Sequence, residues 1–384
     1  MSASRSQERE APAPTVDFDL HGLVGIRLLD ATDADARVVR RQLGPLEAAL
    51  HREPDILIRF VDSLHLSSRL RYLGVDDAGF TDDAFLVLRA RHKARARVRL
   101  PLHEVGRSPE IVCERGTPSV PFLIPIVNLT ALSKGVLPLH ASAFQRDGVG
   151  IVTTGWSKGG KTEALLAFME QGASYVADEW VYVSADGRRA HGIPEPIRLW
   201  DWHLRELPAR RTAVARGDRA RLGMLRTAVG LERWIPRQGG LPPSKALRRT
   251  MPVLRRQLHV DVPPERLFDR SSILRSTGFD RLFFVASAEG AQMHVEPVDP
   301  LEVADRMAFS LEHERLDFMA CYEKFRFAFP DVACPGIESA VGSERDLLRA
   351  AFAGKQAHTV VHPYPVSLRA LFEAMEPHCR PDGG

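Results

Sequence analysis

The expected fold is decided by one stretch of the sequence, Gly150-Ile151-Val152-Thr153-Thr154-Gly155-Trp156-Ser157-Lys158-Gly159-Gly160-Lys161-Thr162. Residues 150–154 are short, apolar or β-branched, which is typical of a buried strand. A glycine-rich loop follows at 155–160. Over residues 161–172 the apolar side chains recur with helical spacing and end at a glycine suited to a C-cap. This strand–loop–helix order predicts an α/β protein.

The same stretch matches the pattern G-x-x-x-x-G-K-[ST] with Gly155, Gly160, Lys161 and Thr162. The two glycines permit backbone angles that a side chain would forbid, so the loop can turn its N–H groups toward a phosphate. Lys161 would bridge the β- and γ-phosphate oxygens, and the Thr162 hydroxyl would coordinate Mg²⁺. The remaining cofactor-binding candidates lie between the motif positions and are Ser157, Lys158 and Gly159. The motif predicts a purine nucleoside triphosphate, ATP or GTP, bound with Mg²⁺.

Two adjacent carboxylates, Asp178 and Glu179, follow the loop within a stretch at 173–183 that reads as a core strand. Two adjacent carboxylates there resemble the Walker B arrangement, in which one holds Mg²⁺ directly or through water and the other can accept a proton from an attacking hydroxyl. Alternation along a regular strand would place the two on opposite faces, so the alternative is that one is merely exposed at a polar strand end.

A second motif overlaps the first, because residues 155–159 also match G-x-S-x-G, the nucleophile elbow of α/β-hydrolases. In that interpretation Ser157 is the nucleophile, Asp178 is the acid, and the base is one of His294, His313 and His362. The phosphate pattern fixes four positions and the elbow three, which favours phosphate binding. A purely structural glycine loop is the third alternative.

The composition of the whole chain limits the classes of protein to which it can belong. Its 384 residues carry a net charge of +3, which does not indicate nucleic acid or a membrane surface as a partner. Four unclustered cysteines and an N-terminus without an apolar signal segment predict a cytoplasmic protein. We expect a disordered tail at 1–14, an α/β or β-rich N-terminal domain of unknown role at 15–115, and a nucleotide-binding domain at 116–384.

A basic helical insertion is expected at about 205–256, a stretch that contains thirteen Arg and one Lys but only three acidic residues. Three interpretations stay open for it. It is a solvated helical face, a lid whose arginine forks close over phosphates, or a docking surface for an acidic partner.

The run Leu139-His140-Ala141-Ser142-Ala143, the loop 155–162 and the run Val176-Ala177-Asp178-Glu179 occur in this order and spacing. Together they resemble the HPr serine kinase/phosphorylase family and its HPr-kinase-like relatives, which share a nucleotide-binding fold with phosphoenolpyruvate carboxykinases. The resemblance is specific from His140 to Glu179 and weaker downstream. It does not cover the N-terminal domain or the Arg-rich segment.

The resemblance implies roles for individual residues. Lys161 and the loop amides would hold the phosphates, Thr162 and Glu179 would bind Mg²⁺, Asp178 would be the base, and His140 would lie close to the phosphates. The family usually has Asp in place of Glu179 and Gly in place of Lys158. Both departures put the reverse, phosphorylase activity and the identity of the substrate in doubt.

The function implied is an ATP-dependent kinase that transfers the γ-phosphoryl group to a Ser or Thr hydroxyl of a peptide or protein. A ribosomal peptide precursor and a phosphocarrier are the two acceptors the resemblance suggests, and the family's tendency to oligomerise allows a homo-oligomer. The alternative is a nucleotide-binding regulatory or scaffold protein without phosphoryl transfer, motivated by the large N-terminal domain. A translation-type GTPase is disfavoured because Asp19-Leu20-His21-Gly22 precedes the loop and no N-K-x-D motif occurs.

Overall fold

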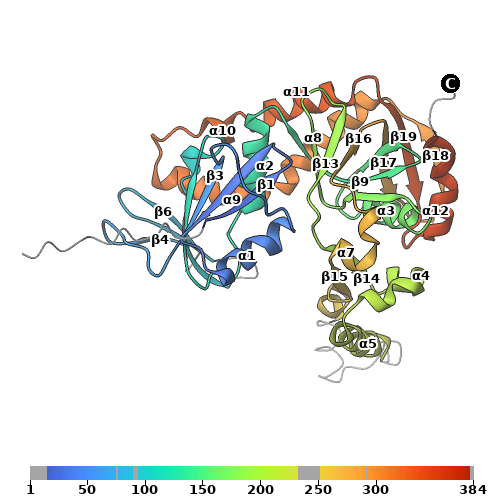
Figure 1. Ribbon diagram of the computed structural model, residues 1–384, viewed down its shortest axis with the longest axis horizontal. Helices are drawn as coiled ribbons and strands as arrows, with labels where there is room; N and C mark the ends of the chain where they lie inside the picture. The colour runs from blue at the N-terminus through green and yellow to red at the C-terminus, as the bar shows by residue number, and fades with distance from the viewer. Residues whose placement is uncertain (1–14, 75–76, 90–93, 232–250, 291, 381–384) are drawn as a thin grey trace, which may run out of the picture. The chain divides into compact units, whose positions relative to one another are not determined.

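A computed structural model describes residues 15–74, 77–89, 94–231, 251–290 and 292–380 (Figure 1); the expected tail at 1–14 lies outside them. The chain is a mixed α/β protein with several sheets, as predicted. It divides into two compact units. The first unit holds residues 1–138 and 311–347, and the second holds residues 139–310 and 348–384.

This division differs from the expected one at 15–115 and 116–384. The helix α2, Leu123–Ser133, is apolar around most of its circumference and packs on the N-terminal sheet at β2. Further along the chain, residues 311–347 return to the same sheet, where α9 packs on β5. Apolar surface that must be buried therefore places both segments in the first unit.

The first unit is built on an eight-stranded sheet in the order β1-β2-β3-β8-β7-β6-β5-β4. Its strands are β1 Val16–Leu20, β2 Val24–Leu29, β3 Ile56–Val61, β4 Arg71–Leu73, β5 Ala78–Phe80, β6 Phe85–Arg89, β7 Arg95–Arg99 and β8 Glu110–Glu114. Its other helices are α1 Asp33–Leu43, α9 Leu316–Ala328, α10 Pro335–Glu338 and the part of α11, Ala340–Phe352, that ends at Leu347.

The two faces of this sheet have different covers. On one face Phe85 of β6 meets Phe325 of α9 edge to face, with ring centroids 5.6 Å apart. On the other face the segment 62–70 packs over a small apolar cluster that includes Leu86, Leu88 and Val112. Beside the sheet, a buried, bidentate ion pair between Arg315 and Glu344 joins the start of α9 to α11.

The second unit is built on a nine-stranded sheet in the order β16-β13-β12-β9-β10-β17-β19-β18, with β11 paired to β9. Its strands are β9 Leu137–Arg146, β10 Val149–Thr154, β11 Ser174–Ala177, β12 Trp180–Val183, β13 Arg189–Gly192, β16 Ser276–Gly278, β17 Arg281–Ser287, β18 His294–Pro297 and β19 Gln356–His362. A separate two-stranded ribbon is formed by β14 Ile197–Trp200 and β15 His259–Val262.

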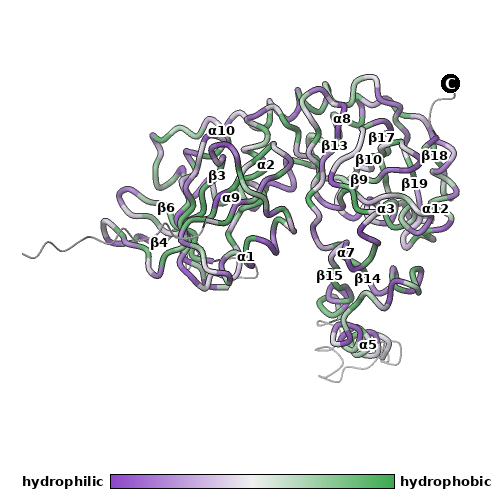
Figure 2. The backbone as a smooth tube through the Cα atoms, viewed as in Figure 1, coloured by the Kyte–Doolittle hydropathy of each residue, from purple (hydrophilic) through white to green (hydrophobic). Residues whose placement is uncertain are grey.

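Helices pack against this sheet and ribbon. They are α3 Lys161–Met169, α4 His203–Glu206, α5 Arg216–Leu231, α7 Pro264–Leu267, α8 Pro300–Glu314 and α12 Leu368–Met375. Short 3₁₀ turns in the two units lie at Leu102–Glu104, Pro208–Ala213, Arg270–Ser272 and Glu376–His378. The hydrophobic stretches of the backbone follow the strands inside each unit (Figure 2). Among the residues with described positions, no helix is both long enough and apolar enough to cross a membrane.

The core of the second unit explains why α3 is buried on nearly all sides. Phe168 of α3 stacks on Phe144 of β9 with ring centroids 4.7 Å apart. Its other side meets Phe372 of α12 edge to face at 5.0 Å. A helix that is apolar all round needs such a cover on each face. These contacts pack the C-terminal half of α3 between β9 and α12.

Candidate functional site

The glycine-rich loop leaves the carboxyl end of β10 in the middle of the sheet. β10 runs antiparallel to β9 and parallel to β17, which in turn runs parallel to β19. The carboxyl ends of the three parallel strands therefore meet at one edge. In α/β sheets this is the edge where ligands bind. The observed strand, loop and helix match the prediction for residues 150–172, although α3 ends at Met169.

Two glycines allow the loop to pack closely against the neighbouring strands. Gly155 has φ 151°, and a Cβ placed on it would lie 2.3 Å from the carbonyl oxygen of Val285 in β17. Gly160 has φ 119°, and its Cβ would lie 2.1 Å from Nε2 of His362 at the end of β19. No other residue fits at Gly155 without moving the backbone of β17, or at Gly160 without displacing the His362 ring. Lys158 also has a left-handed backbone, with φ 64°.

Lys161 points back into this loop. Its Nζ donates to the carbonyl oxygens of Gly155 and Trp156, each at 3.1 Å, and the residue is only 5% exposed. The helix that it begins has Gly160 as its N-cap, and no side chain accepts a cap hydrogen bond there. A helix N-terminus with a lysine beside it favours an anion electrostatically.

The predicted pair of Thr162 and Asp178 is brought together. Thr162 Oγ1 donates to Asp178 Oδ2 at 3.2 Å, and Asp178 is 3% exposed. Asp178 Oδ1 is buried and has no hydrogen-bond partner among the described residues. Burial, and then the nearby charge of Glu179, raise the pKa of Asp178 well above its usual value of 3.8.

The prediction that Asp178 and Glu179 lie inside one strand over 173–183 is wrong. They occupy a bend between β11 and β12, and the pairing of β11 with β9 shifts register just before the bend. The irregularity turns the chain, so strand alternation does not decide where the two side chains point. The two carboxylates still diverge, because each has a different partner.

Glu179 contacts His140 of β9. His140 Nε2 lies 3.0 Å from Glu179 Oε2, and the His140 ring also packs on Trp180 at 5.6 Å between centroids. The Glu179 side chain is 46% exposed while the His140 side chain is 7% exposed. The structure thus brings Thr162 and Asp178 together as one pair, and His140 and Glu179 together as another.

His362 is the residue whose importance sequence reasoning missed. It was a candidate only as a hydrolase base, yet it lies fully buried beneath the loop. Its Nε2 is 3.0 Å from the carbonyl oxygen of Gly159, and its Nδ1 is 2.8 Å from that of Pro363. Both partners are backbone carbonyl oxygens, on either side of the ring. A signal for it was its place at the end of an apolar, β-branched run at 356–362.

A second buried histidine supports α3 from the side. His203 Nε2 lies 3.1 Å from Glu163 Oε1, and His203 Nδ1 accepts a hydrogen bond from the Trp200 backbone N–H at 3.2 Å. The acceptor role of Nδ1 assigns the proton to Nε2, which then donates to Glu163. This pair anchors the first turn of α3 to the ribbon β14–β15.

The hydrolase alternative finds no support in the contacts of Ser157. Within the part of the chain that is described, no hydrogen bond joins Ser157 to His294, His313 or His362. The nitrogens of His362 face backbone carbonyls instead. An activated serine requires a base within hydrogen-bond reach.

The Arg-rich segment at 205–256 is helical over α5, Arg216–Leu231, and its part at 232–250 lies outside the described residues. Some of its arginines make structural contacts. Arg221 donates to the carbonyl oxygens of Gln257 and His259, and Arg210 pairs at 2.7 Å with Glu170, the C-cap residue of α3. The segment is therefore tied to the second unit at several points, and the lid and docking interpretations stay predictions.

No protein-family model matches this chain, and no curated protein matches it. The interpretation of the site therefore rests on its residues and their geometry.

Proposed function

We propose that the second unit binds a purine nucleoside triphosphate, taken as ATP, at the loop 155–160. The observation that carries the proposal is the position of Lys161. Its buried ammonium group is held by two loop carbonyls at the uncapped start of α3. A buried cation at the start of a helix, beside a glycine-rich loop, forms a site for phosphate oxygens.

The neighbouring oxygens fit a magnesium ion. Asp178 Oδ1 is a buried acceptor without a partner among the described residues, and the Thr162 hydroxyl lies 3.2 Å from the other carboxylate oxygen. No three His, Cys, Asp or Glu side chains gather into a metal cage in the described part of the chain. That agrees with Mg²⁺, which keeps several waters and takes further ligands from phosphates. When bound, the ion would neutralise negative charge on the phosphates.

We further propose that the protein is an HPr-kinase-like enzyme that transfers the γ-phosphoryl group to a Ser or Thr hydroxyl of a peptide or protein. The raised pKa of Asp178 supports its role as the base, because a carboxylate with a raised pKa takes up a proton more readily. Lys161 would hold the transferring group in line, so that catalysis consists mainly of positioning and charge stabilisation. His140 would orient Glu179 at the edge of the site.

Nucleotide binding is tested by calorimetry with ATP and GTP in the presence of Mg²⁺. We expect Lys161→Ala to abolish measurable binding, because it removes the buried cation. Lys158→Ala is the matched comparison in the same loop, where the lysine is exposed. It should weaken binding severalfold at most. Equal, unweakened binding by both variants would refute the assignment of the loop.

Phosphoryl transfer is tested separately with γ-labelled ATP and a library of Ser- and Thr-containing peptides. Asp178→Asn keeps the size and one acceptor oxygen of the side chain but removes the base. We expect it to bind ATP and to lose transfer by a factor of at least about 100, the usual contribution of a general base. A variant that transfers phosphate as fast as the parent would exclude Asp178 as the base.

A second candidate function is nucleotide binding without transfer, in a regulatory or scaffold protein. One observation favours it. The carboxylate of Glu179, expected to help bind Mg²⁺, is instead engaged by His140 at 3.0 Å. ATP binding by the parent protein with no labelled product from any peptide would support this candidate over the kinase.

A further inference from the structure

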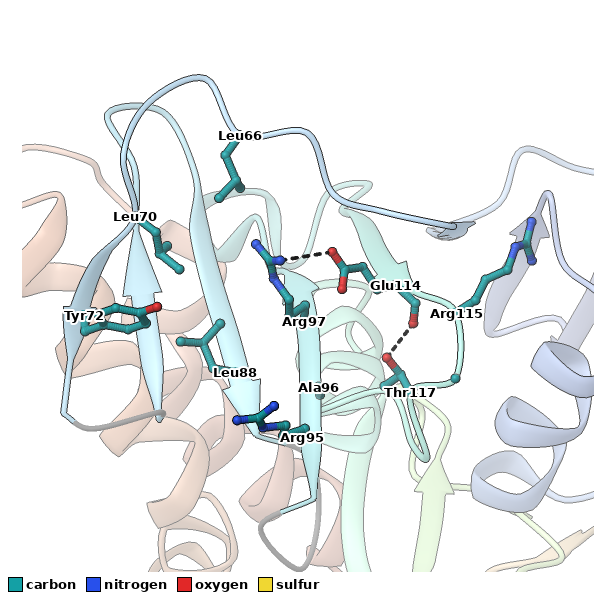
Figure 3. Close-up of a pocket in the computed structure, with 11 residues that line it drawn as sticks. Leu66, Leu70, Tyr72, Leu88, Arg95, Ala96, Arg97, Glu114, Arg115 and Thr117 are labelled. Atoms are coloured by element: carbon teal, nitrogen blue, oxygen red, sulfur yellow. Dashed lines mark hydrogen bonds and ion pairs between the residues drawn. The ribbon is translucent and has the colours of Figure 1, made fainter.

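The first unit contains a pocket that belongs to no part of the proposed nucleotide site. It lies on the sheet face opposite α9, and Leu88, Arg97 and Glu114 from three neighbouring strands line it. The segment 62–70 arches over this face (Figure 3). Leu70 in this segment leans onto the sheet at Gly79, where an added Cβ would lie 2.9 Å from Leu70 Cδ1.

The pocket has a volume of about 560 Å³. Sites for small ligands measure roughly 300–1,000 Å³ and combine apolar walls with a few polar groups. This pocket has both kinds of lining. Its lining residues are Leu66, Leu70, Tyr72, Leu88, Arg95, Ala96, Arg97, Glu114, Arg115, Gly116 and Thr117.

Positive charge exceeds negative charge among the side chains that line the pocket. Arg97 reaches toward Glu114, with a long separation of 3.6 Å between Nη1 and Oε1 (Figure 3). That same oxygen of Glu114 already accepts a hydrogen bond from the Leu64 backbone N–H at 2.9 Å. Arg95 is exposed and forms no ion pair with any described residue. The pocket therefore has two cations and one carboxylate that is partly neutralised.

Arg115 does not add to this excess. Its side chain points away from the pocket (Figure 3) and is held by Asp35 at 2.6 Å and Asp62 at 2.9 Å. The positive charge that faces the cavity comes from β7, whose sequence places Arg95 and Arg97 on one face of the strand. The third arginine on that face, Arg99, does not line the pocket.

We propose that this pocket binds a small amphipathic carboxylate. The apolar body of the ligand lies against Leu66, Leu70 and Leu88, and its carboxylate pairs with Arg97 and Arg95. The planar fork of an arginine matches the two oxygens of a carboxylate, and an arginine with one distant partner keeps donors for a second. The apolar wall excludes small hydrophilic anions, because they would gain nothing from burial there.

The proposal is tested on the full chain with three probes in saturation-transfer NMR and calorimetry. They are 4-phenylbutyrate, 4-phenylbutylamine, which has the same apolar body with the opposite charge, and acetate, which has the charge without the body. We expect the phenylbutyrate to bind with a dissociation constant at or below about 1 mM, given the contribution that an atom of a drug-sized ligand typically makes. The amine and acetate should bind at least about tenfold more weakly.

Two variants, together with one control variant, test whether the ligand binds in this pocket. Arg97→Gln should weaken phenylbutyrate binding about tenfold, because it removes a charge-assisted pair. Arg99→Gln is the matched control on the same strand face and should leave binding unchanged. Leu70→Asp is the second test variant. It puts a negative charge on the apolar wall and should abolish the binding of phenylbutyrate. Thermal midpoints and near-ultraviolet circular dichroism check that each variant is folded.

Three outcomes would overturn the proposal: equal binding of the amine, equal loss in the Arg97 and Arg99 variants, or no binding of phenylbutyrate at about 10 mM, well above the expected constant. The result is independent of the proposed kinase activity. All lining residues belong to the first unit, so ATP binding by Arg97→Gln should equal that of the parent.

Discussion

Replacing Gly160 by alanine should be among the most damaging single-methyl additions to this protein. Gly160 has φ 119° and ψ 8°, a conformation that L-residues rarely adopt. An added Cβ would lie 2.1 Å from His362 Nε2 and 2.9 Å from Cε1. The imidazole cannot move aside freely, because it is fully buried and bonded to the carbonyl oxygens of Gly159 and Pro363.

The magnitude follows from two contributions. Forcing alanine into this backbone conformation costs about 1–3 kcal/mol. Displacing the ring breaks its bond to Gly159 and leaves a buried donor or acceptor unpaired, which costs about 1–3 kcal/mol more. We therefore expect Gly160→Ala to lower the free energy of unfolding by about 4 kcal/mol. Gly148→Ala is the control. Gly148 has φ 83° with no heavy atom within 4 Å of an added Cβ, so only the backbone cost of about 1–2 kcal/mol applies.

The assay is urea unfolding followed by tryptophan fluorescence. All five tryptophans have sequence positions within the second unit, so their emission reports the unfolding of that unit alone. A double-mutant cycle with His362→Ala then isolates the clash. Once the ring is absent, Gly160→Ala should cost at least about 1 kcal/mol less than it does in the parent.

The reasoning is refuted if Gly160→Ala is no more destabilising than Gly148→Ala. It is also refuted if the effects of Gly160→Ala and His362→Ala are additive within about 0.5 kcal/mol, the range expected for independent sites.

Three further predictions follow from other parts of the structure. Burial, and then the charge of Glu179, raise the pKa of Asp178 above 3.8 in the folded protein. The stability linked to its proton is therefore lost as the pH rises from 3.8 through the raised pKa. Asp178→Asn should unfold at a higher urea concentration than the parent near neutral pH, and this difference should shrink toward about pH 4. Glu344→Ala leaves the buried Arg315 guanidinium without its carboxylate partner and should cost about 3 kcal/mol; the unfolding transition seen by far-ultraviolet circular dichroism should shift to lower urea while the tryptophan transition stays unmoved. Gly223→Ala in α5 meets no atom within 4 Å and should raise stability by about 0.5–1 kcal/mol; a lower urea midpoint would contradict this.

The local parts of the candidate site could be predicted from the sequence. Residues 150–172 form the expected strand, loop and helix because apolar periodicity and glycine placement act over a few residues. Thr162 and Asp178 were both candidate site residues from the sequence, and the structure joins them by a hydrogen bond. The break between β11 and β12 was not, because it depends on how this segment pairs with β9.

His362 shows where sequence reasoning stops. It lies 203 positions from Gly159 in the chain, and no local pattern links the two. Their contact follows from the parallel placement of β10, β17 and β19 in one sheet. Strand order is set by long-range packing of apolar faces, and a single sequence does not state which strand lies beside which.

By itself the sequence determined an α/β chain in which a strand, a glycine-rich loop and a helix that begins with a lysine follow one another, because these depend on residue chemistry and short-range periodicity. The tertiary structure alone decided that residues 311–347 return to the N-terminal sheet and that the segment 62–70 covers an arginine-lined pocket. It also decided that His362 supports the loop from below. Each of these joins residues far apart in the chain, and such contacts arise only when separate elements bury their apolar faces together.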